Sequence, residues 1–335
     1  MRWTPYLDEC LRQLEKTREY PTDLLLVYLV RAQLISNEAS RSPWNDTLGD
    51  ATANSLPDLY LKALKSQLDD LKRSVPPELQ ANGSSLFVSQ LLQKNLLTHL
   101  PETLQLHLLH TVLNIHEHSL STSPSKNMSS DPSRQLQRIE NVWTCLTAVK
   151  SSFEIFFSLD HFPPSCYPQT SMAIFAQVAH CLATLFRLST FDSPDVPWDR
   201  QLVRQELDLG EIARLLADRW GEVPAAAGLD MSGIGENEVD LWNVSKKRFM
   251  GIANWWETNV AAAAAAAAGT GAGSDGAGGV VVEHGNGTEA VNGWCSGQKQ
   301  MEAANFAATN TDFLDDAWMR DLFAGDYEFT LDAFL

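Results

Sequence analysis

Residues 175–191 read FAQVAHCLATLFRLSTF, and this stretch decides the class of fold. Large apolar side chains recur in it at intervals of three or four residues, at Phe175, Val178, Leu182, Leu185 and Phe186. This spacing is typical of one face of an α-helix that packs against other elements. No stretch of the sequence shows the sustained two-residue alternation of a half-buried strand. The sequence therefore predicts an all-α fold.

The same apolar repeat recurs along most of the first 258 residues. Thr4 and Pro5 supply an N-cap and a first-turn proline for an opening helix. Residues 24–35 are apolar on nearly all sides, as in a central helix. Helices are also predicted over residues 61–75, 86–97, 100–118, 139–157, 171–188, 198–220 and 236–258. We therefore expect an irregular multi-helix domain over residues 1–258.

Three segments lack the repeat. Residues 37–57 are polar and contain proline, and residues 119–133 are rich in Ser and Pro, so the first is expected to be a loop and the second a mobile surface loop. Residues 259–308 contain eight consecutive alanines and then a Gly/Ser/Asn tract. Such a composition has too few large side chains to build a core, so it predicts a disordered linker.

The linker leads to an acidic and aromatic tail, residues 309–335. Its last part, 312–335, reads DFLDDAWMRDLFAGDYEFTLDAFL, in which seven carboxylates stand against one base, Arg320. Alternating acidic and large apolar residues are typical of disordered activation segments. The carboxylates repel one another and keep the rings accessible, so that a partner can order the tail on binding.

Five side chains of the tail are the predicted anchors for a transcriptional coactivator: Trp318, Leu322, Phe323, Tyr327 and Phe329. The alternative interpretation is a C-terminal amphipathic helix docked on its own domain. The first three anchors have the i, i+4, i+5 spacing that such a helix requires.

Charge and cysteine content exclude several classes of protein. Residues 236–335 carry fifteen acidic and five basic residues, out of 42 and 25 in the whole chain. This balance disfavours direct nucleic-acid contact. The cysteines are five in number and have no Cys-x2-Cys spacing, which argues against a disulfide framework and a structural zinc site. No signal peptide is evident, and Val260 with the alanines is too short to span a bilayer, so no membrane association is expected.

Motifs that could carry catalysis are weak. The glycines of a G-x-G-x-x-G pattern, Gly271, Gly273 and Gly276, lie in a glycine tract and not between a strand and a helix. Four histidines cluster near residues 107–118, but no carboxylate spacing of a known metal motif accompanies them, so partly solvated histidines are the favoured interpretation. We expect no catalytic residue, no cofactor and no metal site in the chain.

Residues 176–200, AQVAHCLATLFRLSTFDSPDVPWDR, resemble the middle regulatory region of fungal zinc binuclear cluster (six-cysteine) transcription factors. Residues 3–7 and 24–33 and the acidic DDAWMRDLF of the tail are similar to that family as well. The positions of the central motif that we single out are His180, Arg187, Phe191, Asp192, Trp198 and Asp199.

The central motif is interpreted mainly as a structural corner. Thr190 or Asp192 is expected to cap or turn the chain, and a helix is expected to begin at 197–199. Arg187 is expected to pair with Asp192 or Asp199 and so hold the corner. The alternative is that the corner contacts a ligand.

The resemblance implies a regulatory domain of a transcription factor, located in the nucleus or shared with the cytoplasm. The family's DNA-reading module, six cysteines that bind two zinc ions, has no match in this sequence, so zinc and DNA contacts are carried over to no residue. Either the reading frame is truncated, or the protein regulates without touching DNA. The favoured function is a regulator that recruits a coactivator through its tail.

Two other classes of function are the alternatives. The first is an all-α module that senses a metabolite among its Trp-rich helices or binds a protein, without activation. A small-molecule effector would be its partner. The second is an enzyme, which the lack of a nucleophile–base pair or metal-binding set disfavours.

Overall fold

The computed structural model describes residues 4–20, 22–41, 56–80, 100–120, 132–193, 196–231 and 240–270. Within these ranges there is no strand, only an isolated bridge between Ser193 and Val196, so the all-α prediction is confirmed. The elements in chain order are α1 (Pro5–Thr17), α2 (Asp23–Arg41), α3 (Leu56–Ser74), η2 (Pro77–Leu79), α5 (Leu100–His116), η3 (Glu117–Leu120), α6 (Pro132–Phe157), η4 (Pro164–Gln169), α7 (Met172–Thr190), α8 (Arg200–Glu206), α9 (Leu209–Ala226) and α10 (Leu241–Thr270).

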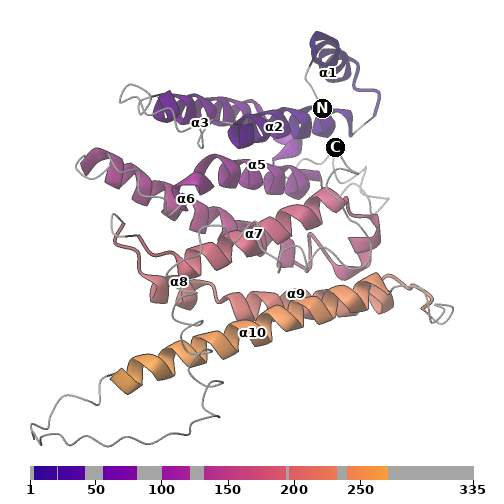
Figure 1. Cartoon of the computed structure of the whole chain (residues 1–335). Helices are drawn as coiled ribbons and strands as arrows, with labels where there is room; N and C mark the ends of the chain where they lie inside the picture. Colours follow the sequence, from indigo (N-terminus) through magenta and orange to yellow (C-terminus); the bar gives the residue numbers. More distant parts are fainter. Residues whose placement is uncertain are drawn as a thin grey trace, which may run out of the picture.

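The helices are stacked in layers (Figure 1). The top layer in that view holds α1, α2 and α3, and the bottom layer pairs α9 with α10. Between them, α2 packs on α5, α5 on α6, α6 on α7, and α7 on α9. One continuous hydrophobic core therefore runs from α2 to the α9–α10 pair.

The helix α7, which contains the stretch FAQVAHCLATLFRLSTF, lies inside this stack. Ser171 caps it, because its side chain accepts a hydrogen bond from the backbone N–H of Ala173. By length and composition alone α7 could cross a membrane, but 67% of its most apolar window is buried inside the molecule. Its neighbours α5, α6, α8 and α9 cover it, which explains why it is apolar on most sides.

Aromatic rings fill the core beneath α7. The Phe156 ring lies 5.4 Å from that of Tyr167 and 5.9 Å from that of Trp220. The Trp220 ring also lies 5.2 Å from that of Phe249, which joins α9 to α10. Rings at such distances contribute more than their buried area alone. The 3-10 turn η4 thus reaches the α9–α10 pair through Tyr167.

Where the start of α9 meets α10, Trp256 of α10 is 3% exposed and packs against Gly210 of α9. A Cβ atom at Gly210 would lie 3.0 Å from Oδ1 of Asp208 and 3.2 Å from Cδ1 of Trp256, so even an alanine there would force these side chains to shift slightly. The guanidinium of Arg204 lies 5.2 Å from the centre of a Trp256 ring. These contacts fasten α10 to the rest of the molecule.

The boundaries of two helices differ from expectation. The helix predicted over residues 198–220 is divided into α8 and α9, because Asp199 and Asp208 each cap a helix start with their side chain. The helix α10 continues past residue 258 through the alanine run to Thr270. Alanine has the highest helix propensity of all residues, which explains the extension into the expected linker.

Several predictions lie outside the described residues. They are the helix over residues 86–97, most of the loop 119–133, the linker beyond residue 270 and the tail 309–335. The expected loop over residues 37–57 is partly wrong, since α2 continues to Arg41.

Candidate functional site

Three charged or ionisable side chains meet where the end of α5 contacts α7. His180 Nε2 donates a hydrogen bond to Glu117 Oε2 at 2.8 Å, and Arg187 Nη1 lies 3.6 Å from the same oxygen. The side chains of His180, Glu117 and Arg187 are exposed by 21%, 25% and 22%. His180 and Arg187 are seven residues apart on α7 and therefore point to the same side of it. We call these three residues the Glu117 triad.

The expected pairing of Arg187 with Asp192 or Asp199 is wrong. Arg187 lies beside Glu117 of η3, whereas Asp192 Oδ2 lies 3.5 Å from Arg200 Nη2. Asp199 Oδ1 instead accepts hydrogen bonds from the backbone N–H groups of Gln201 and Leu202. Asp199 is occupied because it caps α8, and Arg187 lies on the side of α7 that contacts η3.

The Glu117 triad changes the ionisation of its own members. Burial acts to raise the pKa of the Glu117 carboxyl, but the hydrogen bond and charge of His180, together with the charge of Arg187, outweigh it. The pKa of Glu117 is therefore below its usual value, and the carboxylate is charged at neutral pH.

His110 packs its ring edge-on against the ring of His180, with centroids 5.1 Å apart. Burial, and then the neighbouring His180 and His107, lower the pKa of His110 to about 3. Burial disfavours the charged form of an imidazole, so His110 is neutral at physiological pH. His110 is thus an uncharged ring that packs against His180 of the Glu117 triad.

A second polar group, which the sequence did not indicate, surrounds Asn141 on α6. Its Oδ1 atom accepts hydrogen bonds from Lys65 Nζ at 2.8 Å and from His116 Nδ1 at 3.0 Å. Its Nδ2 atom donates to Ser119 Oγ at 2.9 Å. Asn141 is 4% exposed and thus connects α3, α5 and η3 from inside the core. The only signal in the sequence was a polar residue next to the apolar positions of α6.

Two ionisable side chains that bind Asn141 have lowered pKa values. Burial, and then the charge of Lys65, lower the pKa of His116 to about 4. Burial likewise lowers the pKa of Lys65. His116 is therefore neutral at physiological pH, and its Nδ1–H is available to Asn141.

The remaining motif residues build a corner after α7. Trp198 Nε1 donates to the backbone carbonyl of Leu188 at 2.9 Å, and its ring meets that of Trp143 at 5.0 Å. Phe191, which is 4% exposed, lies beneath the guanidinium of Arg138 at 5.5 Å. This geometry agrees with the structural interpretation of the motif, since its aromatic members are used in packing.

The buried cysteines are thiols of low reactivity. Burial raises the pKa of both Cys145 and Cys181 to about 12. Neither is a thiolate at neutral pH, and a thiol is a poor nucleophile. In the described ranges, no group of three or more His, Cys, Asp or Glu residues has a geometry that could hold a metal ion.

The structure does not place the predicted coactivator anchors. Trp318, Leu322, Phe323, Tyr327 and Phe329 all lie outside the described residues. Among the described residues, the motif positions are brought together only in part: His180 and Arg187 join the Glu117 triad, while Phe191 and Trp198 form the corner with Trp143 and Arg138.

The comparisons with known proteins bear on both parts of the chain. A family model described as ATEG07667_C, C-terminal domain, matches residues 164–331. A curated protein named transcription factor opdL, from Penicillium oxalicum, is 31% identical over 249 residues, which is 74% of this chain and 39% of the relative. A transcription factor from Aspergillus terreus is 30% identical over 213 residues, or 62% of this chain and 33% of the relative.

The chain thus spans less than half the length of these relatives. No solved structure matches the chain.

Proposed function

The chain belongs to the family of fungal transcription factors whose C-terminal domain it matches over residues 164–331, and from this premise we propose that it is the regulatory and activating portion of a transcriptional regulator. The helical body, residues 1–258, would be the regulatory domain. Residues 309–335 would recruit a coactivator.

The composition of the tail is the observation that carries this proposal. Seven carboxylates alternate with large apolar side chains over residues 312–335, and one basic residue accompanies them. Like charges keep such a segment from collapsing, and the rings then supply the binding energy when a partner covers them. The carboxylates would speed the encounter with a basic surface. Trp318, Leu322, Phe323, Tyr327 and Phe329 are the proposed anchors.

The polar groups of the body support a structural role for the motif of residues 176–200. In the Glu117 triad and around Asn141, the polar atoms are largely directed at one another. We therefore propose that the body performs no catalysis and binds no cofactor. We also propose that residues 1–335 contact neither DNA nor zinc, and that the protein acts in the nucleus.

An experiment on the isolated tail tests the proposal. Residues 300–335 fused to a heterologous DNA-binding domain are expected to activate a reporter gene in a fungal host. A fusion of residues 1–258, which lacks the tail, is the matched control and is expected to give background output. Background output from the tail fusion, at a protein level equal to that of the control, would contradict the proposal.

A further inference from the structure

The helix α2 is apolar around most of its circumference but lies in an outer layer of the molecule. Such a helix is expected to be covered on all sides. Leu26 is nevertheless 47% exposed, and Val30 and Leu34, which follow it at intervals of four residues, are only partly buried. These three side chains therefore form an apolar stripe on the outer side of α2.

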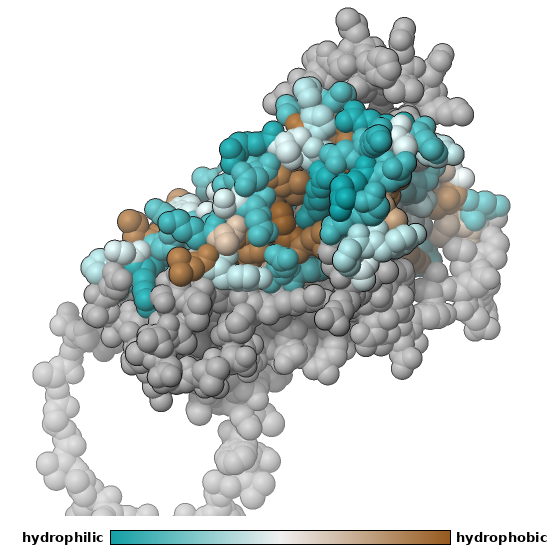
Figure 2. Space-filling model, turned by 90° about the horizontal axis from the view of Figure 1, so that it is seen from above, coloured by the Kyte–Doolittle hydropathy of each residue, from teal (hydrophilic) through white to brown (hydrophobic). Residues whose placement is uncertain are grey.

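An open groove of about 460 Å³ lies between α2 and α3 where this stripe ends. Figure 2, which views the outer layer from above, shows hydrophobic residues at the bottom of a hollow between hydrophilic ones. The apolar floor of the groove includes Leu34, Ile35 and Leu71. Small-molecule pockets normally enclose most of their ligand, whereas an open groove fits one face of a helix.

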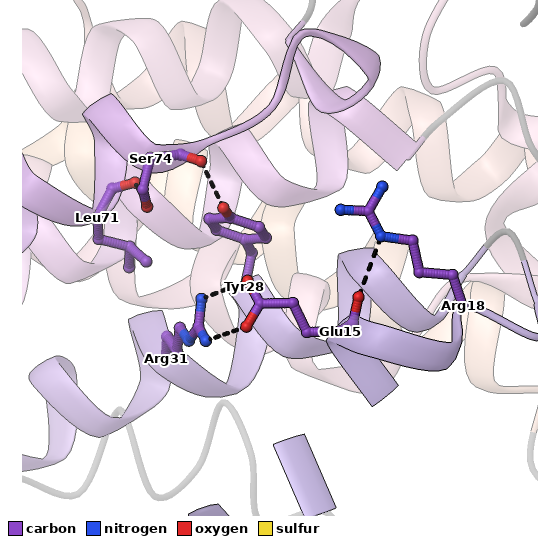
Figure 3. A network of polar contacts seen from close by, with 6 residues as sticks. All are labelled: Glu15, Arg18, Tyr28, Arg31, Leu71 and Ser74. Carbon is purple, nitrogen blue, oxygen red and sulfur yellow. Dashed lines mark hydrogen bonds and ion pairs between the residues drawn. The ribbon is translucent and has the colours of Figure 1, made fainter. Parts of the chain in front are cut away.

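The basic residue that lines the groove is already paired (Figure 3). Arg31 Nη2 donates to Glu15 Oε2 at 2.6 Å, and Arg31 Nη1 donates to Glu15 Oε1 at 3.2 Å. The charge of Arg31 is therefore balanced by α1. At the same end of the groove, the Tyr28 hydroxyl donates to the backbone carbonyl of Ser74 and so holds α2 against α3.

The other charges that line the groove are negative. Glu38 of α2 has no ion pair among the described residues. Asp70 of α3 pairs with Arg73, but these side chains are exposed by 65% and 76%, and such an exposed pair contributes little. An apolar floor thus lies between two walls that each carry a carboxylate. This surface is complementary to one that is apolar in the middle and basic at its edges.

The helix α1 shows how an amphipathic helix binds to α2. It packs on α2 and contacts it through an apolar face, on which Leu11 is buried. At the edge of this face Glu15 pairs with Arg31. A second amphipathic helix in the groove would extend this arrangement, with the signs of the paired charges reversed.

We propose that the groove between α2 and α3 binds an amphipathic helix of a partner protein, whose apolar face is flanked by lysine or arginine. The apolar side chains of the partner cover Leu34, Ile35 and Leu71, and its basic side chains pair with Glu38 and Asp70. The chain has 42 acidic and 25 basic residues, so a basic partner is also attracted at longer range. The inference is independent of the activating role of the tail.

A designed peptide tests this surface in the whole chain, residues 1–335. The probe is a fluorescein-labelled peptide of leucine and lysine only, with its leucines at i, i+3, i+4 and i+7. The wild-type chain is expected to bind it, as measured by fluorescence anisotropy. Glu38→Lys replaces attraction with repulsion at one wall and should weaken binding at least about fivefold. Leu34→Asp places a charge on the apolar floor and should weaken binding at least about tenfold.

Asp69→Lys is the matched control, because it makes the same change of charge on an exposed position of α3 that does not line the groove. The acidic tail is unchanged in every variant, so a peptide that binds only to the tail would have equal affinity for Glu38→Lys and Asp69→Lys. A peptide with glutamate in place of lysine should bind Glu38→Lys more tightly than it binds the wild type. Circular dichroism of each variant checks that the helices are retained.

Three results would each overturn the proposal. The first is equal affinity of Glu38→Lys and Asp69→Lys for the lysine peptide, and the second is a Leu34→Asp variant that binds like the wild type. The third is a wild-type chain that does not bind the peptide. That result is expected if a second copy or another segment of the chain covers the groove.

Discussion

Replacing Trp318, Leu322 and Phe323 together with alanine is expected to lower the activation by residues 300–335 at least about tenfold. An aromatic hot spot at a protein interface contributes about 2 kcal/mol or more, so the two rings of Trp318 and Phe323 already account for more than a tenfold change in coactivator binding. The seven carboxylates remain in the variant, so its charge is unchanged. The measurement is reporter output from the fusion with a heterologous DNA-binding domain.

The control for this variant removes two apolar side chains that lie before the proposed segment. Met301 and Phe306 both precede residue 309, and their joint replacement with alanine should leave the output near that of the unchanged fusion. Equal output from the triple variant and the unchanged fusion would reject the anchoring role of the three side chains. In that case the carboxylates and the two remaining anchors, Tyr327 and Phe329, would account for activation.

The helical body is expected to lose stability as the pH falls from 6.5 to 5. His110 and His116 have folded-state pKa values of about 3 and about 4, below the ordinary value of 6.5. Between these values and pH 6.5 the unfolded chain binds protons that the folded chain does not, so stability falls as the pH is lowered through 6.5. Lowering the pH from 6.5 to 5 should cost roughly 2–4 kcal/mol in the free energy of unfolding.

Protonation of the Glu117 carboxylate also lowers the stability of the folded body, at lower pH than the titration of the two histidines. The pKa of Glu117 is lowered in the folded state. Its contribution to the free energy of unfolding is therefore fully present above the ordinary pKa of a glutamate, and it is lost as the pH falls below that pKa. Urea unfolding followed by circular dichroism between pH 5 and pH 7.5 measures the part of the pH dependence that the two imidazoles cause. His116→Gln should reduce the slope by up to one proton, because glutamine does not titrate. A free energy of unfolding that stays constant from pH 7 to pH 5 would contradict the assignment of the two buried imidazoles.

The helices could be predicted where local rules act alone. The apolar repeat of residues 175–191 gave α7, and Thr4 with Pro5 marked the start of α1. The separation of α8 from α9 depends on Asp208, a local N-cap signal that the apolar repeat around it concealed. The family resemblance of residues 176–200 was likewise readable from the order of its residues, and the comparisons confirm it.

The partners of the polar side chains could not be predicted, because they come from distant parts of the sequence. Arg187 was expected to pair within its own corner, but Glu117, seventy residues earlier, lies closer in space. Asn141 collects donors from α3 and α5, which no spacing within α6 encodes. The apolar circumference of α2 predicted a buried helix, and only the layer order shows that one side of it faces outward.

Activation is assigned to the tail, residues 309–335, and regulation to the helical body. Fusing the whole chain to a heterologous DNA-binding domain, with and without residues 309–335, tests that division most directly. We expect the truncated fusion to accumulate normally and to lose most of its reporter activity. Undiminished activity after the truncation would place activation in the helical body and contradict the central claim.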